Sequence, residues 1–169
     1  MPIVANATNV AHVVIRAERA DHPQVVALLA ELDRYLLALY APEHNHILDV
    51  RALLAPSVTM LTAWRGDQLV GCGAMRRMPA EADTAGRAFG EIKRMMVAPA
   101  ARGQRIAQQL LAALEALLRS GGLKLALLET GAEQTQAVRL YERCGYVRRA
   151  AYGGYPDNGL SLFYAKVLA

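Results

Sequence analysis

The chain has 169 residues, of which 54% are hydrophobic, so it is long enough and apolar enough to fold as one domain with a full core. This composition argues against a disordered chain, and no apolar run reaches the length of a membrane span. The formal net charge of +4 is a first clue to a ligand, because a basic excess favours anionic partners.

The N-terminus and the cysteines bear on the cellular location of the protein. Residues 1–9 show no basic stretch followed by a long apolar block, so we expect no secretory signal. The two cysteines, Cys72 and Cys144, lie far apart in apolar surroundings. We expect free thiols there rather than a disulfide or a metal site. Together these features predict a cytoplasmic protein.

The first half of the chain predicts a strand, two helices and a hairpin. Asp21 is a candidate helix cap and Pro23 suits a first turn, and leucines follow at helical spacing. A turn at residues 65–67 separates two strand-like runs, which is typical of a hairpin. In chain order, the predicted elements are a strand at 10–16, a helix from Asp21 to about Tyr40, a short helix at 49–54, and strands at 58–64 and 68–78.

The second half alternates strands with helices. Residues 89–97 predict a buried strand, which Pro99 ends because proline has no N–H to donate to a sheet. Apolar residues between Ile106 and Leu118 then recur on one face of a helix. The elements predicted after this helix are a strand at 123–129, a helix at about 134–144, and strands at 146–152 and 160–167 joined by a loop at 153–159.

Basic residues gather where the strand at 89–97 meets the helix after it. Between Arg87 and Arg105 the chain has five basic residues and one acid, Glu91. The start of a helix presents unpaired N–H groups and the positive end of its dipole, and such a point binds phosphate. The segment has neither a Walker sequence nor the three spaced glycines of a dinucleotide site. Because aromatic residues do not interleave with these charges, an anionic cofactor is a better prediction than nucleic acid.

Two segments resemble one family. Residues 97–111 (VAPAARGQRIAQQLL) are similar to the acyl-CoA-binding motif of the GNAT superfamily of N-acetyltransferases, which reads Arg or Gln, two residues, Gly, one residue, Gly or Ala. Arg102 and Ala107 match the ends of the motif, whereas Arg105 replaces its middle glycine. That side chain either crowds the approach of the backbone to the diphosphate or binds the phosphates itself. Residues 137–146 (AVRLYERCGY) resemble a second family segment, Ala-x-x-Leu-Tyr-Glu-x-x-Gly-Phe.

The resemblance implies a fold, a cosubstrate and a set of contacts. The fold is a single GNAT domain over residues 1–169, an α/β (α+β) arrangement in which helices flank a mixed central sheet in the order β-α-α-β-β-β-α-β-α-β-β. The cosubstrate is acetyl-CoA, and no metal is implied. The implied cofactor contacts are Met95, Met96 and Val97, whose backbone N–H groups would bind the oxyanion, then Arg102, Gly103, Gln104, Arg105, Ile106 and Ala107, and finally Gln134 and Tyr141.

The resemblance also implies catalytic roles. Tyr141 matches a tyrosine that protonates the departing thiolate, and a phenol has a suitable pKa for this step. Its alternative role is to pack and orient the cofactor. An amine acceptor needs a base, and Glu91 and Glu129 both match positions of bases in different family members; of the two we expect Glu91. The structural alternative for either glutamate is a salt bridge to a basic neighbour: Lys93, Arg94 or Arg139.

Two loops are expected to border the acceptor. The loop after the first helix would contribute Glu43, His44 and His46, which are either acceptor contacts or a solvated loop. The His-x-His spacing has no third ligand nearby, so we expect no metal. The loop near the C-terminus would contribute an acidic and aromatic rim that suits a cationic amine. The residues of this rim are Tyr152, Tyr155 and Asp157.

The predicted function is transfer of an acetyl group from acetyl-CoA to a primary amine of a small molecule, by direct attack and without a covalent acyl-enzyme. One alternative is a protein N-terminal or lysine acetyltransferase, which Glu129 as the base would favour. A second is a non-catalytic acyl-CoA-binding regulatory protein, which the departure at Arg105 keeps open. We expect no nucleic-acid or membrane partner, and the apolar C-terminal strands could pair in a homodimer.

Overall fold

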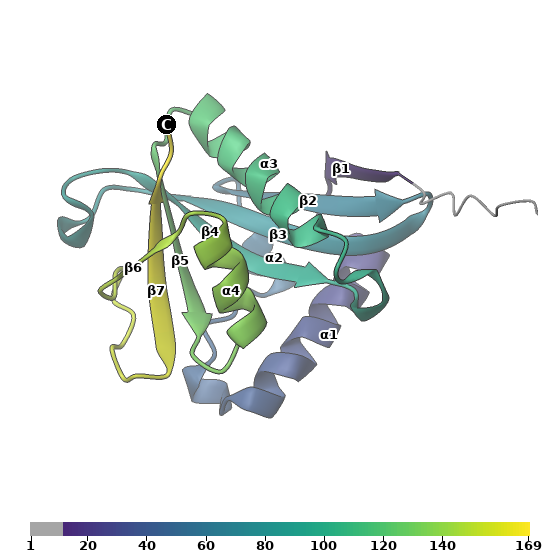
Figure 1. Ribbon diagram of the computed structural model, residues 1–169, viewed down its shortest axis with the longest axis horizontal. Coiled ribbons are helices and arrows are strands. Elements are labelled where there is room, and N and C mark those ends of the chain that lie inside the picture. The colour runs from purple at the N-terminus through teal and green to yellow at the C-terminus, as the bar shows by residue number, and fades with distance from the viewer. Residues whose placement is uncertain (1–11) are drawn as a thin grey trace, which may run out of the picture.

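The computed structural model describes residues 12–169. The predictions for residues 1–9, and the first two positions of the strand predicted at 10–16, lie outside the described residues. Within the described chain, seven strands form one mixed sheet in the order β1-β2-β3-β4-β5-β7-β6 (Figure 1). The strands are β1 (Val13–Ala17), β2 (Val58–Arg65), β3 (Gln68–Met78), β4 (Phe89–Val97), β5 (Leu125–Gly131), β6 (Val147–Arg149) and β7 (Ser161–Val167). The helices are α1 (Pro23–Leu39), α2 (Val50–Leu53), α3 (Ile106–Ser120) and α4 (Thr135–Arg143), so the predicted order of elements is confirmed.

Helices cover both faces of the sheet. Figure 1 shows α3 and α4 on the face toward the viewer and α2 behind the sheet. The neighbouring residues Met60 and Leu61 of β2 belong to different cores, Met60 to the core with α1 and α2 and Leu61 to the core with α3. Consecutive strand residues point to opposite faces, so the two cores lie on opposite sides of the sheet. The apolar stripe predicted for α3 is confirmed, because Ile106, Leu110, Leu111, Leu114 and Leu118 are all buried.

The predicted cap of the first helix is wrong. His22 is the cap of α1, and its Nδ1 accepts a hydrogen bond of 3.2 Å from the backbone N–H of Gln24. Asp21 instead pairs with Arg19 at 2.8 Å. The reason is that Pro23 is the first helical residue, which makes the residue directly before it the cap.

The strand predicted at 146–152 is also too long. β6 ends at Arg149, and Tyr152 lies in the loop of residues 150–160 that leads to β7. β6 is an edge strand that pairs with β7 through three residues. Beyond it, Tyr152 is buried in a small aromatic core with Phe89 and Phe163. Among residues 12–169, no helix has both the length and the apolar character needed to cross a bilayer.

Candidate active site

The strands β4 and β5 diverge in the middle of the sheet. They pair in parallel at one end, and this pairing ends at Ile92 and Leu128. Just beyond, the register of β4 against β3 shifts, and Arg94 has a φ of 58°. This left-handed conformation costs a non-glycine residue roughly 1 kcal/mol or more. The buried Arg94 guanidinium pairs with Asp33 of α1, which helps to hold the irregular strand. The result is a cleft between β4 and β5.

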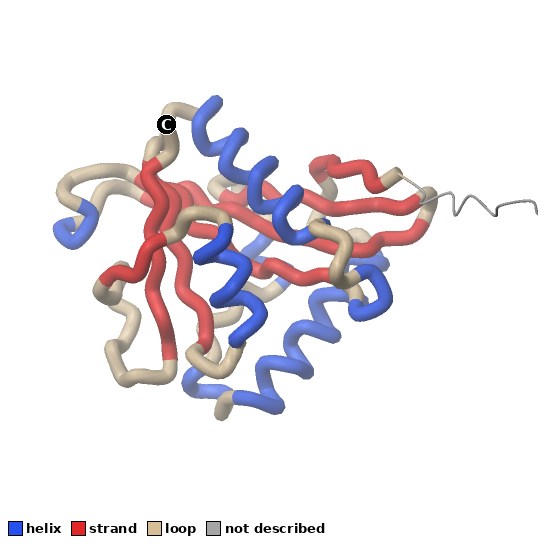
Figure 2. Tube along the Cα trace, in the orientation of Figure 1, coloured by secondary structure: helices blue, strands red, loops and turns tan. Residues whose placement is uncertain are grey.

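Segments from distant parts of the chain line this cleft. They come from α1 and the loop after it, from β4 and β5, from the cap and last turn of α4, and from the start of β7 and the residue before it. Figure 2 shows the loops after β5 and before β7 at the same end of the molecule as the end of α1. The predicted site residues that line the cleft are His44, His46, Met95, Glu129, Gln134 and Tyr141. One cavity therefore holds members of the predicted catalytic, cofactor and acceptor groups.

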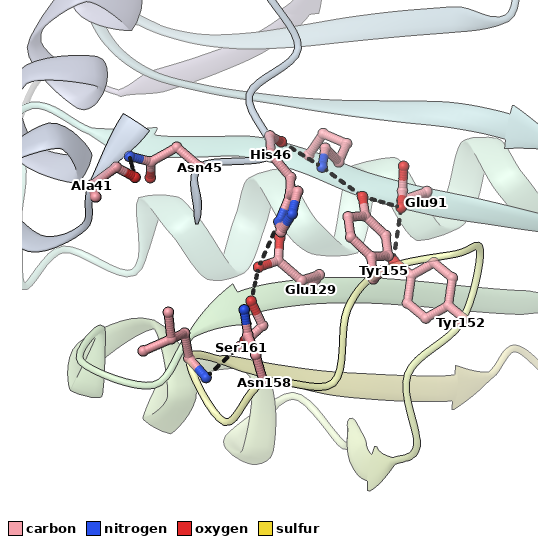
Figure 3. A network of polar contacts seen from close by, with 11 residues as sticks. Ala41, Asn45, His46, Glu91, Glu129, Tyr152, Tyr155, Asn158 and Ser161 are labelled. Atoms are coloured by element: carbon pink, nitrogen blue, oxygen red, sulfur yellow. Dashed lines mark hydrogen bonds and ion pairs between the residues drawn. The ribbon is translucent and has the colours of Figure 1, made fainter. Parts of the chain in front are cut away.

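Glu129 presents a carboxylate to the cleft from the end of β5. Its Oε1 accepts a hydrogen bond of 2.6 Å from the hydroxyl of Ser161, and Nδ1 of His46 lies 3.7 Å from the same oxygen (Figure 3). The side chain is 13% exposed. Glu129 thus keeps access to the cleft and has an imidazole beside it, an arrangement that can accept and pass on a proton.

Tyr141 reaches the same cleft from α4. Its side chain is buried. Burial raises the pKa of this phenol well above its ordinary value, and the negative charge of Glu129 raises it further. The phenol is therefore protonated throughout the neutral range, and the raised pKa also makes it a weaker acid than a free tyrosine.

Glu91 lies on β4 outside this cleft, in a second pocket beneath the 150–160 loop. It is 1% exposed. One oxygen pairs with Arg76 at 2.7 Å, and the other accepts hydrogen bonds of 2.8 Å from the hydroxyls of Tyr152 and Tyr155 (Figure 3). The salt bridge is thus made with Arg76 and with none of the three basic residues suggested by the sequence.

These partners also set the acidity of Glu91. Burial raises the pKa of the carboxyl, but the charge of Lys93, the two tyrosine hydroxyls and Arg76 together outweigh burial and hold that pKa below its ordinary value. Because both oxygens are engaged and the pKa is lowered, Glu91 is a weak base in this arrangement. We therefore propose Glu129 for that role.

Lys93 is a residue of the cleft that sequence reasoning did not select. It is 7% exposed, and its ammonium donates hydrogen bonds to the carbonyl of His46 at 3.1 Å and to the hydroxyl of Tyr155 at 2.9 Å. Burial lowers the pKa of this ammonium, while Glu91 and Glu129 partly oppose the shift. A signal was present in the sequence: Lys93 is two residues after Glu91 in a strand, so both side chains share one face.

The predicted phosphate loop joins β4 to α3. Arg105 is the residue before the helix and has a φ of 60°, and its side chain makes no cap hydrogen bond. This is the position where the motif has glycine, so the backbone keeps a conformation that favours glycine. Arg102 and Arg105 are exposed. An uncapped helix start with two exposed guanidinium groups fits a diphosphate.

Other predicted contacts spread more widely. Met96 packs in the core with α1, and the carbonyl of Val97 accepts a hydrogen bond of 3.2 Å from Nε of Arg102. Glu43 and Asp157 are exposed and line neither pocket. Within residues 12–169, no group of three or more His, Cys, Asp or Glu side chains is placed to hold a metal ion.

Comparisons with known proteins show the family of the chain. The sequence model of the acetyltransferase (GNAT) family matches residues 25–146. The IAA acetyltransferase of Azospirillum brasilense is 43% identical over 157 residues, which cover 93% of this chain and 99% of that protein.

Solved structures share the fold. A protein of Klebsiella pneumoniae superposes with a TM-score of 0.76 at 33% identity, covering 94% of this chain and 99% of that one. A GNAT family acetyltransferase of Elizabethkingia anophelis, solved with acetyl-CoA bound, has a TM-score of 0.62 at 20% identity and covers 92% and 98% of the two chains. As the two sequence segments predicted, the chain belongs to the acetyltransferase (GNAT) family and is an acetyl-CoA-dependent N-acetyltransferase.

Proposed function

We propose that the chain transfers the acetyl group of acetyl-CoA directly to the primary amine of a small molecule bound in the cleft between β4 and β5. The observation that carries this proposal is that Glu129 and Tyr141, a carboxylate and a protonated phenol, line the same cleft. The loop of residues 102–107 and the first turn of α3 would hold the diphosphate of the cofactor.

In this proposal, Glu129 removes a proton from the acceptor ammonium, directly or through His46. The neutral nitrogen then attacks the thioester carbon and forms a C–N bond. The carbonyl oxygen becomes an oxyanion, for which the backbone N–H groups of residues 95–97 are the predicted donors. The C–S bond breaks, and Tyr141 protonates the leaving sulfur. The nitrogen loses two protons in all: one restores Tyr141 and one passes to solvent.

A covalent acyl-enzyme is not part of the proposal. Cys72 is completely buried, and burial raises the pKa of its thiol to about 12. Burial also raises the pKa of the Cys144 thiol. A protonated thiol is a poor nucleophile. Direct transfer within a complex of both substrates needs neither cysteine.

A second candidate acceptor is the α-amino group at a protein N-terminus. The position of Glu129 in the cleft favours it, since the family resemblance implies a base at this place in some members with that activity. The two candidates use the same chemistry and differ in what lies beyond the amine.

The test is thiol release from acetyl-CoA across amino acids, polyamines, aminoglycosides and short peptides, with mass spectrometry of the products. Turnover of one small-molecule class, with an N-acetylated product, supports the proposal. Turnover of peptides alone supports the second candidate. Acetyl-CoA binding without thiol release from any amine would replace both with a binding protein.

A further inference from the structure

We infer that Lys93 binds an anionic group of the acceptor, a carboxylate, so that the substrate class is amino acids with apolar side chains. This inference rests on the proposed function, because it names the acceptor of that reaction. It begins from the charge on Lys93 rather than from the catalytic residues.

The ammonium of Lys93 is buried without an ion-pair partner. Lys93 is 7% exposed. Salt bridges occur elsewhere among residues 12–169, but none of them includes Lys93. A buried charge is costly unless an opposite charge meets it, so this site favours the arrival of an anion.

Lys93 also has a hydrogen-bond donor to spare. A lysine ammonium carries three N–H donors. Two go to the His46 carbonyl and the Tyr155 hydroxyl, both of which are neutral acceptors. The third has no partner among residues 12–169, and Lys93 lines the cleft itself. A carboxylate in the cleft would accept this third bond and form the direct ion pair that Lys93 lacks.

The charges of two nearby carboxylates act on Lys93, yet neither carboxylate forms an ion pair with it. Glu91 faces Arg76 and two tyrosines in the second pocket. Glu129 accepts from Ser161 and lies beside His46. The cleft therefore offers a carboxylate for an incoming ammonium and, separately, an ammonium for an incoming carboxylate. An amino acid carries both groups.

Apolar side chains form part of the wall of the cleft, beside polar ones such as Asn45, Thr130 and Gln134. The apolar ones are Leu32, Leu36, Ile47, Ile92 and Leu160. An apolar side chain on the acceptor would lose water on entering and gain favourable burial. A polyamine would instead bring a second cation toward Lys93, and a peptide N-terminus has an uncharged amide where an amino acid has its carboxylate.

The test is calorimetric binding to the enzyme–CoA complex, which requires no turnover. The ligands are L-leucine, L-leucinamide and 3-methylbutylamine, which share a side chain and an amine, and only leucine has a carboxylate. We expect leucine to bind about 10- to 100-fold more tightly than either analogue, as a charge-assisted bond predicts. Lys93→Met and Lys93→Gln should bring leucine to the level of leucinamide. Lys124→Met, the same change at an exposed lysine, should keep the preference.

Two results would overturn the inference. One is that the wild-type protein binds leucine no more tightly than leucinamide or 3-methylbutylamine. This result does not depend on the folding of any variant. The other is a folded Lys93→Gln protein that keeps the preference. Failure of the proposed function looks different: leucine would bind through Lys93, yet acetyl-CoA with leucine or any other amine would release no thiol.

Discussion

Tyr155 and Glu91 lie 64 residues apart, yet the tyrosine hydroxyl donates a 2.8 Å hydrogen bond to Oε2 of the carboxylate. Tyr152 donates to the same oxygen at 2.8 Å. These bonds fasten the 150–160 loop to β4, beside the cleft that holds Glu129 and Tyr141. We therefore propose that Glu91 is a positioning residue for the wall of the site.

Glu91→Gln should cost stability more than chemistry. The amide has a similar shape but lacks the charge that pairs with Arg76, so the half-buried guanidinium loses its counterion. We expect a loss of roughly 1–3 kcal/mol in the free energy of unfolding, measured by urea titration. kcat should fall less than in Glu129→Gln. If Glu91→Gln unfolds like wild type but loses as much turnover as Glu129→Gln, Glu91 is the base.

The contribution of Glu91 should disappear in acid. Its pKa in the folded protein lies below the ordinary value of 4.5, because Lys93, the two tyrosines and Arg76 outweigh the effect of burial. Below pH 4.5 the unfolded chain therefore binds the proton first, and acidification favours unfolding. The stability difference between wild type and Glu91→Gln should be constant from pH 7 to 5.5 and shrink as the pH falls through the folded pKa. Urea midpoints at a series of pH values measure it, and a difference that grows in acid would contradict this account.

Arg105 permits a two-variant test of the phosphate loop. Arg105 has a φ of 60°, which glycine adopts without strain and alanine does not. Arg105→Gly should therefore stabilise the fold by up to about 1 kcal/mol, whereas Arg105→Ala should not. Both variants lack the guanidinium, so both should raise the KM for acetyl-CoA severalfold if Arg105 binds phosphate, as we expect. A lower KM in Arg105→Gly alone would show that the side chain crowds the cofactor instead.

Removal of the cysteines should leave the chemistry intact. Cys144→Ala should keep kcat within about twofold of wild type, because direct transfer uses no thiol. Cys72→Ala creates a small cavity in the core with α1 and should cost roughly 1 kcal/mol of stability with little effect on kcat. Steady-state thiol release measures both, with the folded fraction checked by circular dichroism. Complete loss of turnover in Cys144→Ala would contradict direct transfer.

Much of the fold could be predicted because its signals are local. β4 begins and ends at the predicted residues, Phe89 and Val97, since apolar strand residues and a following proline define both ends. α3 begins at Ile106, the first residue of the predicted apolar stripe. The early end of β6 was missed because it depends on what packs against the segment. The cap at His22 was missed although its cause, Pro23 as the first helical residue, is local.

The site was predictable only in part. Tyr141 and Glu129 were found because they belong to, or lie just before, a segment that resembles a family motif. The partners of Glu91 come from β3 and from a loop some 60 residues away, so no local sequence pattern predicts them. Lys93 was counted as one member of a basic cluster, and only the fold shows that it is buried and faces the cleft.

The most direct test of the account is kcat for Glu129→Gln and Tyr141→Phe on the best amine, beside the exposed matched controls Glu31→Gln and Tyr35→Phe. We predict that each cleft variant lowers kcat by about 10²- to 10⁴-fold, as loss of general acid–base catalysis requires. The KM for acetyl-CoA should stay near the wild-type value, and both controls should behave like wild type. Wild-type turnover in both cleft variants would contradict the central claim that these two residues move the protons of the transfer.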